Sequence, residues 1–293
     1  MQERQKIFLD TDIGDDIDDA LALAYALRHP ALDLIGVSTV FRNTACRKRL
    51  TQRFLAAFGR PDIPVGAGVG RPLIAPADVN EIPCQWKDAY GGLPEGSDLH
   101  GVALMLEKLR QNPDAALVAV GPLTNVACAV RLAPELMENT PVFLMGGLIG
   151  RQEPEWNILC DPEAAAIVFS GCRKLTMVGL DVTARCQLSQ ADVDAIRNSG
   201  TAEMRLLTEM IDSWMAISRH LPYLHDPLTV AYAAQPQLLT LAPHRIHVVL
   251  EGALRGATVP CEDAGLPVAQ AAVDVDPPAA VRDIMQTILP KGD

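Results

Sequence analysis

The most chemically distinctive segment of this 293-residue chain is a run of ten residues near the N-terminus that carries six carboxylates. The run follows the apolar residues Ile7-Phe8-Leu9 and contains Asp10, Asp12, Asp15, Asp16, Asp18 and Asp19. Carboxylates this close repel one another and raise each other's pKa values, and a divalent cation is the simplest way to keep several of them ionised. Because the run contains no Cys or His, its ligands would all be hard oxygens. The sequence therefore predicts a site for Ca²⁺ or Mg²⁺ rather than for Zn²⁺ or copper.

The pair Asp10 and Asp12 also allows a second interpretation. In haloacid-dehalogenase-type phosphatases, an Asp-x-Asp turn after a strand supplies a nucleophile and an acid, which would be Asp10 and Asp12 in a Mg²⁺-dependent reaction. Gly14 stands where those enzymes have Thr or Val, and that chemistry has no use for four further aspartates. The structural alternative for Asp18 and Asp19 is a solvated first helical turn, where carboxylates interact favourably with the helix dipole.

Short β-branched or apolar runs recur along the chain, as is typical of buried strands, and they cover residues 6–12, 34–41, 63–67, 116–121, 142–146, 175–181, 246–250 and 268–275. Stretches with helical apolar spacing separate most of them, at residues 18–27, 44–58, 98–110, 124–132, 162–169, 201–221 and 227–234. This alternation predicts an α/β fold with an open, mainly parallel, Rossmann-like sheet flanked by helices. No linker or repeat divides the chain, so we expect a single domain over residues 1–293.

In a parallel sheet, ligands bind beyond the carboxyl ends of the strands. Polar clusters of this chain stand at or just after the ends of expected strands, namely Asp10 and Asp12, Asn43, residues 121–125, residues 145–147 and Asp181. We therefore expect the active site at the carboxyl ends of the strands. Residues 71–97 have no clear period and contain Trp86 and Tyr90. They are expected to form a long loop near the mouth of the site or, equally, an inert surface excursion.

The bulk composition restricts the partners. The net charge is −11 and the pI about 5.0, with no compensating Lys/Arg stripe, which argues against nucleic acid and against an anionic membrane surface. The N-terminus does not resemble a signal peptide, and no apolar run is long enough to span a membrane. The seven cysteines are widely spaced and never form a C-x-x-C pair. They indicate small buried side chains in a reducing cytoplasm.

Two Asp-Pro pairs, Asp161-Pro162 and Asp226-Pro227, precede helical stretches, and helix capping is the favoured interpretation for both. The second pair differs because His225 stands beside it, and a histidine next to an aspartate can act as a general acid. The tripeptide Glu155-Trp156-Asn157 could hold sugar hydroxyls against an aromatic face, although a plain loop would also explain it.

Taken together, these segments resemble the nucleoside hydrolase family, the calcium-dependent enzymes that cleave the N-glycosidic bond of ribonucleosides. The family signature Asp-x-Asp-Pro-Gly followed by Asp-Asp-Ala is similar to residues 10–14 followed by residues 18–20. Ile13 replaces the Pro, and the spacing to Asp-Asp-Ala is longer by two residues. Asp18 and Asp19, rather than Asp15 and Asp16, are aligned with the signature because the residues that follow match it. Further similar segments are residues 40–43, 120–125, 144–147, 155–165, 177–183 and 225–232.

The resemblance implies the roles of the site residues. Ca²⁺ would be held by Asp12, Asp19, Asp226 and the backbone carbonyl of Val120. Asp12 would also activate a calcium-bound water, and His225 would protonate the departing base. The ribose hydroxyls would be bound by Asp18, Asn43, Glu155 and Asn157, with Met145 packed at the sugar. Trp156 and Tyr223 are further candidates for contact with the substrate.

The resemblance also bears on specificity and assembly. His225 before the metal-binding Asp226 is similar to the broad inosine-uridine and the pyrimidine-preferring members, whereas strictly purine-specific members have Trp there. Tyr90 stands where broad-specificity members carry His. Trp86 or Tyr90 could stack on a base, but either could equally pack the loop down. Family members are commonly homodimers or homotetramers. A third interpretation is a calcium-stabilised nucleoside-binding protein without turnover.

Overall fold

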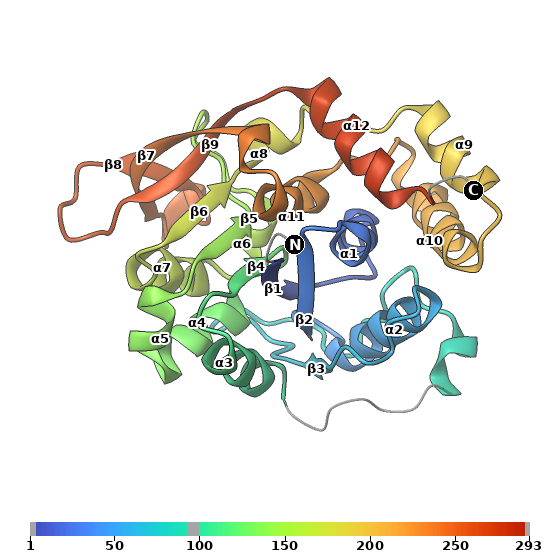
Figure 1. Cartoon of the computed structure of the whole chain (residues 1–293). Coiled ribbons are helices and arrows are strands. Elements are labelled where there is room, and N and C mark those ends of the chain that lie inside the picture. The colour runs from blue at the N-terminus through green and yellow to red at the C-terminus, as the bar shows by residue number, and fades with distance from the viewer. Residues whose placement is uncertain (1–3, 93–99, 291–293) are drawn as a thin grey trace.

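A computed structural model describes residues 4–92 and 100–290 of the chain (Figure 1). Within these residues, nine strands form one sheet in the order β3-β2-β1-β4-β5-β6-β9-β7-β8. The strands from β3 to β9 in this order pair in parallel, whereas β7 is antiparallel to both β9 and β8. Their bounds are β1 Gln5–Thr11, β2 Leu32–Thr39, β3 Val65–Ala67, β4 Ala116–Ala119, β5 Val142–Met145, β6 Leu175–Val178, β7 Leu239–Val248, β8 Thr258–Cys261 and β9 Ala269–Val275. The prediction of an open, mainly parallel α/β sheet is confirmed.

Helices cover both faces of the sheet, and each face has its own hydrophobic core. Within β1, Ile7 and Leu9 join one core and Phe8 the other, as the alternation of side chains along a strand requires. The α-helices are α1 Asp18–Arg28, α2 Thr44–Ala57, α3 Gly101–Gln111, α4 Thr124–Leu132, α5 Pro134–Asn139, α6 Trp156–Cys160, α7 Pro162–Gly171, α8 Leu180–Thr183, α9 Gln190–Asn198, α10 Ala202–Ser218, α11 His225–Ala234 and α12 Pro277–Ile288. Short 3-10 turns are η1 Asp88–Gly92, η2 Pro236–Leu238 and η3 Gly252–Leu254.

The strand order places the site. Strand β1 lies between β2 and β4, so the chain leaves its carboxyl end toward one side and later returns to pair on the other side. This is a topological switch point, where a crevice opens at the carboxyl ends of the strands. Asp12 follows β1 and Val120 follows β4, and the Val120 amide donates to the Asp10 carbonyl at 2.8 Å. The two loops that carry the predicted site residues therefore start side by side.

Several predicted boundaries are wrong. The strand expected at residues 175–181 ends at Val178, because the chain turns at Gly179 into the short helix α8. The strand expected at 246–250 begins earlier, at Leu239. Strand β8 was not predicted, because it is only partly buried and contains Pro260, a residue suited to an edge strand. The expected helix at 98–110 begins at Gly101, and residues 98 and 99 lie outside the described part of the chain.

All seven cysteines are free, but only Cys172 and Cys186 are buried, and Cys84 is exposed. The expectation of uniformly buried thiols is therefore wrong for Cys84. Among the described residues, no helix is both long and apolar enough to cross a membrane.

Candidate active site

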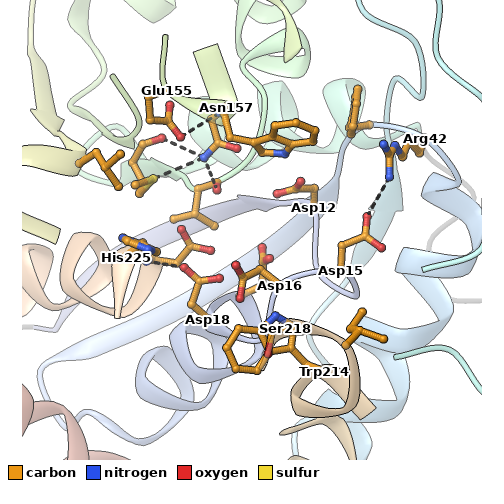
Figure 2. Close-up of a pocket in the computed structure, with 18 residues that line it drawn as sticks. Asp12, Asp15, Asp16, Asp18, Arg42, Glu155, Asn157, Trp214, Ser218 and His225 are labelled. Atoms are coloured by element: carbon orange, nitrogen blue, oxygen red, sulfur yellow. Dashed lines mark hydrogen bonds and ion pairs between the residues drawn. The ribbon is translucent and has the colours of Figure 1, made fainter. Parts of the chain in front are cut away.

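A cavity of about 500 Å³ opens at the switch point, beyond the ends of β1, β4 and β5 (Figure 2). Ten of the predicted site residues line it, from five different segments of the chain: Asp12, Asp18, Asp19, Val120, Met145, Glu155, Trp156, Asn157, His225 and Asp226. Asn43 and Tyr223 are not among the residues that line the cavity. The fold thus brings together most of the side chains that the sequence singled out.

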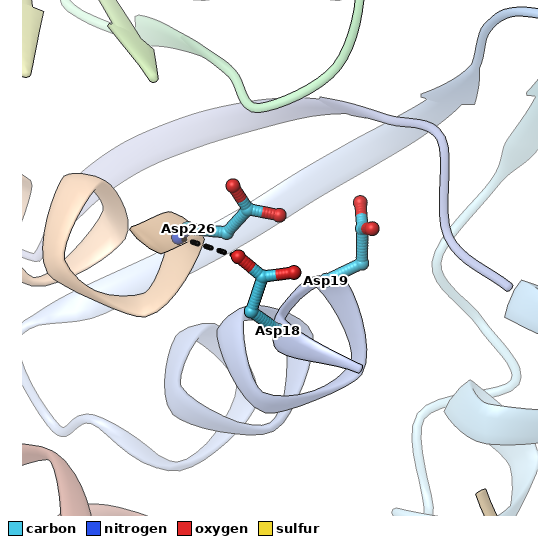
Figure 3. Close-up of side chains that lie close together, drawn as sticks. All are labelled: Asp18, Asp19 and Asp226. Carbon is cyan, nitrogen blue, oxygen red and sulfur yellow. Dashed lines mark hydrogen bonds between the residues drawn. The ribbon is translucent and has the colours of Figure 1, made fainter. Parts of the chain in front are cut away.

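Three carboxylates meet at the floor of this cavity (Figure 3). Asp18 and Asp19 lie in the first turn of α1 and Asp226 in the first turn of α11, and one oxygen of each lies within 4.8 Å of the others. Their exposed fractions are 4%, 3% and 3%, so the alternative interpretation of Asp18 and Asp19 as a solvated helical turn is wrong. Burial and then repulsion between the carboxylates raise the pKa values of all three well above the ordinary range.

The capping prediction holds for one Asp-Pro pair and fails for the other. The Asp161 carboxylate accepts from the Ala164 amide and caps α7. Asp226 does not cap α11, because that helix begins one residue earlier, at His225. The Asp226 amide instead donates to the carboxylate of Asp18 at 3.3 Å, which ties the first turns of α1 and α11 together.

The donor set fits a hard divalent cation. The three buried carboxylates form no ion pair with Lys or Arg in the part of the chain that the structure describes, although like charges at this distance need compensation. The carboxylate of Asp12 lies beside the loop that carries the Val120 carbonyl, since a Cβ added to Gly121 would stand 2.6 Å from Asp12 Oδ1. The Asn157 amide donates to the same carbonyl at 3.0 Å. Carboxylate and carbonyl oxygens are the ligands that Ca²⁺ prefers, and Mg²⁺ uses them too.

Asp10 and Asp12 have different surroundings although they are two residues apart. Asp12 lines the cavity, and burial raises its pKa to about 6 against the lowering effect of Arg47. Asp10 is fully buried outside the cavity, where it accepts from Ser38 at 2.5 Å and from Asn125 at 2.7 Å. A phosphatase nucleophile must reach its substrate, so the position of Asp10 argues against the phosphatase interpretation.

Glu155 and Asn157 form the wall opposite the carboxylates. The Glu155 carboxylate caps α6 by accepting from the amides of Asn157 and Ile158, and it also accepts from the Gly147 amide at 2.9 Å. Gly147 has a φ of +77°, a left-handed conformation that favours glycine and turns the chain after β5 toward Glu155. The side-chain amide of Asn157 is fixed by the carbonyls of Val120 and Met145. Both polar groups are therefore held in place before any substrate binds.

His225 lies on a third side of the cavity (Figure 2). Its Nδ1 is 2.8 Å from the Thr183 hydroxyl, which leaves Nε2 available for a ligand. Burial, followed by the nearby His220, lowers the pKa of His225 to about 4, so the ring is neutral at neutral pH. Tyr223 stacks on His225 with ring centroids 5.4 Å apart, and thus supports this ring without lining the cavity.

The remaining predicted residues have structural contacts. The Asn43 side chain accepts from the Cys46 amide and caps α2. Within the loop that begins at residue 71, Tyr90 is buried in the core and Trp86 packs edge-on against it, so the packing alternative holds for both. Residues 93–97 of that expected loop lie outside the described part of the chain. Other parts of the loop do contact the site, since Gln85 bonds to the carbonyls of Asp15 and Asp16.

Sequence reasoning missed one wall of the cavity. Trp214, Ile217 and Ser218 line it from the C-terminal end of α10, and Phe41 and Arg42 line it from the loop after β2. The Ser218 hydroxyl is buried without a hydrogen-bond partner within the described residues. The sequence offered only a weak signal for this wall, an amphipathic helix that ends close before His225.

Buried carboxylates, fixed amides and a neutral histidine at the switch point of a parallel sheet define an α/β enzyme whose chemistry acts on a small polar substrate. The sequence matches the family described as inosine-uridine preferring nucleoside hydrolase over residues 7–282. The chain belongs to this family, and the activity of the family is the hydrolysis of ribonucleosides.

Individual relatives agree with this assignment. The chain is 33% identical to the probable uridine nucleosidase 2 of Arabidopsis thaliana, with 98% of both proteins covered. It is 34% identical to the pyrimidine-specific ribonucleoside hydrolase RihA of Klebsiella pneumoniae, with 84% of this chain and 85% of that protein covered. Among solved structures, the plant nucleoside hydrolase PpNRh1 is similar over 98% of this chain and 99% of its own, with a TM-score of 0.86 and 27% identity.

Proposed function

We propose that this enzyme hydrolyses the N-glycosidic bond of ribonucleosides to free base and ribose with Ca²⁺ as cofactor, with Asp12 as general base and His225 as the acid for the leaving base. The observation that carries the proposal is the meeting of Asp12, the carboxylates of Asp18, Asp19 and Asp226, and His225 around one cavity. A binding protein would have no need for a base and an acid at different sides of one bond.

The ligands proposed for Ca²⁺ are Asp12, Asp19, Asp226 and the Val120 carbonyl. When bound there, Ca²⁺ would lower the pKa of a coordinated water and offset the repulsion among the carboxylates. Asp12 accepts the proton of the attacking water.

The proposed ribose site consists of Asp18, Glu155 and Asn157, with Met145 against the sugar and Trp156 at the rim. Trp156 is 58% exposed and lines the cavity, as expected for an aromatic ring that covers a bound sugar. Oxygens fixed around the ring stabilise the oxocarbenium character that develops as the bond breaks. We assign supporting roles to Asn43, which fixes the start of α2, and to Tyr223, which holds the ring of His225.

His225 supplies the proton for the leaving base. The proton comes from the imidazolium form of the ring, in which Nδ1 donates to the Thr183 hydroxyl and Nε2 faces a nitrogen or oxygen of the base; the pKa of about 4 makes this form a strong acid that is only a small fraction of the protein at neutral pH. The named activities of the Arabidopsis and Klebsiella relatives favour uridine and other pyrimidine nucleosides as substrates. A cytoplasmic location, a homodimer or homotetramer and a single domain over residues 1–293 stay predictions.

The test is the release of base and ribose from uridine, cytidine, inosine and adenosine, with and without chelator, by the wild-type protein and Asp12→Asn. We expect chelator-sensitive hydrolysis, fastest with the pyrimidine nucleosides. No release from any of the four by folded, Ca²⁺-loaded protein would contradict the proposal and favour a binding protein.

Two further substrates test how the sugar is held. Deoxyuridine should react poorly because Asp18 would lose a hydroxyl partner, and uridine 5′-monophosphate should react poorly because the carboxylates repel its phosphate. Rates equal to that of uridine would contradict these two contacts without affecting the class of reaction.

A further inference from the structure

Arg47 is the most completely buried cation near the site. It belongs to α2, its side chain is 0% exposed, and it does not line the cavity. A buried guanidinium must have its donors satisfied, and here every described partner lies on one of two neighbouring loops. Nη1 donates to the carbonyls of Asp12 and Ile13, Nη2 donates to the Asp15 carboxylate at 2.7 Å, and Nε donates to the Phe41 carbonyl at 2.9 Å.

These contacts join the carboxyl ends of two adjacent strands. Asp12, Ile13 and Asp15 follow β1, and Phe41 follows β2. Phe41 and Arg42 have φ values of +65° and +53°, a left-handed conformation that non-glycine residues adopt only when their surroundings impose it. The bond from Arg47 to the Phe41 carbonyl is one of the contacts that impose it. One side chain therefore fixes both loops from behind the cavity wall.

The conformation of the loop after β1 requires stabilisation of this kind. It is two residues longer than the family signature to which it is similar, and the carboxylates that it carries repel one another. Arg47 neutralises Asp15 from one side. Gln85 closes the loop from the other side, because its backbone amide donates to the Gly14 carbonyl and its side chain donates to the Asp16 carbonyl at 2.6 Å.

We infer that Arg47 is a positioning residue, which sets the carboxylate of Asp12 in the cavity by holding the Asp12 carbonyl on the opposite side of the backbone. With that carbonyl fixed, Asp12 Oδ1 lies against Gly121, beside the Val120 carbonyl. The inference rests on the proposed function, since it gives Asp12 its role as base. A misplacement of about 1 Å in a reacting group can cost on the order of 100-fold in rate. Loss of the contacts made by Arg47 would therefore lower kcat.

The experiment uses Arg47→Lys, assayed with uridine at Ca²⁺ concentrations raised until the rate no longer changes. Lysine keeps the charge but lacks the planar fork that reaches three carbonyls and a carboxylate together. We expect kcat to fall about 10- to 100-fold while KM changes less than about threefold. The matched control is Arg28→Lys, at an ion pair with Glu203 at the end of α1, which should keep the wild-type kcat. Wild-type kcat in folded Arg47→Lys would overturn the inference, and so would a fall that merely parallels a lower melting temperature.

A second comparison separates positioning from general support of the fold. In an Asp12→Asn background, Arg47→Lys should lower the residual rate by less than about twofold, because the group that it positions is gone. An equal loss in both backgrounds would overturn the inference. Should Arg47→Lys not fold, Gln85→Ala releases the loop from its other side and should lower kcat with little change in KM; an unchanged kcat would overturn the inference. Wild-type activity in Asp12→Asn alone would instead show that the proposed function is wrong.

Discussion

Aspartates of one short segment take part in two groups of carboxylates that have opposite surroundings. The first group is Asp15 with Glu81, and the second is Asp18 and Asp19 with Asp226. Asp15 points toward arginines, with Arg47 at 2.7 Å and Arg42 at 3.7 Å, and Arg42 also pairs with Glu81 at 2.6 Å. Asp18 and Asp19 form no ion pair with these arginines within the described residues, and they meet Asp226 from α11. In the first group the protein supplies its own cations.

The second group has no ion pair with an arginine or lysine in the part of the chain that the structure describes, although Arg47 lowers the pKa of Asp19. Its three carboxylates are almost fully buried, and their pKa values are raised by burial and then by repulsion from neighbouring carboxylates, Asp12 and Asp16 included. The arginine-paired group is more exposed, with 37% of the Asp15 side chain accessible. Carboxylates paired with arginines thus maintain the loop, whereas buried carboxylates without such an ion pair in the described residues form a cluster that could hold a cation.

The largest expected effect concerns Asp12, which stands between the two groups. Asp12→Asn should lower kcat by about 10²- to 10⁴-fold, the range expected for loss of a general base, while the melting temperature changes little. The matched control is Asp62→Asn, at an exposed ion pair with Arg60 far along the chain from the site, and it should keep full activity. Steady-state kinetics with uridine would contradict the assignment of Asp12 if both variants were equally active.

His225 should produce the next largest effect, and one that depends on the leaving group. His225→Gln should slow the hydrolysis of uridine by about 100-fold, because the base departs poorly without a proton. The hydrolysis of p-nitrophenyl riboside, whose leaving group departs as p-nitrophenolate without protonation, should lose less than about tenfold. Equal losses on both substrates would show that His225 serves another purpose than proton donation.

The same substitution should change stability in opposite directions in the two groups. A carboxyl whose pKa is raised by folding destabilises the native state when it is ionised, so Asp19→Asn should increase the unfolding free energy of metal-free protein at neutral pH by about 1 kcal/mol. Asp15→Asn leaves Arg47 without its charged partner and should decrease it by about 1–2 kcal/mol, less than for a fully buried pair because Asp15 is partly exposed. Urea unfolding with chelator present measures both values, and shifts of the same sign would break the comparison.

The smallest effect on kcat is predicted at Gly121. A Cβ there would stand 2.6 Å from Asp12 Oδ1 and 2.9 Å from Val40, so Gly121→Ala must displace one of these groups. We expect kcat to fall about tenfold, which corresponds to about 1.4 kcal/mol. Gly265→Ala, in an exposed turn, is the control. An unchanged kcat in Gly121→Ala would mean that the carboxylate of Asp12 can move without loss of function.

The sequence predicted the sheet well because its strands are short apolar runs between polar turns, as in residues 116–119 and 142–145. The density of carboxylates indicated the acidic cluster. From the residues alone the pair Asp226-Pro227 favours a helix cap, and only the resemblance to the family implies a role of Asp226 as a metal ligand. The apolar wall formed by Trp214 and Ile217 depends on how α10 packs against α1 and α2, which periodicity does not encode.

Arg47 shows most clearly which contacts cannot be predicted from the sequence. In the sequence it is one of several basic residues in a helix, and such residues usually lie on a solvated face. Its burial follows from the carbonyls and the carboxylate that two distant loops present to it. Long-range contacts of this kind are visible only in the folded structure.

A Ca²⁺ titration of metal-free protein, in which bound ion and uridine hydrolysis are followed together, gives the most direct test of the proposed metal site. The account predicts one tightly bound ion per chain, hydrolysis that rises in parallel with binding, and loss of both in Asp19→Asn. Full activity in metal-free protein, or unchanged binding in Asp19→Asn, would contradict it.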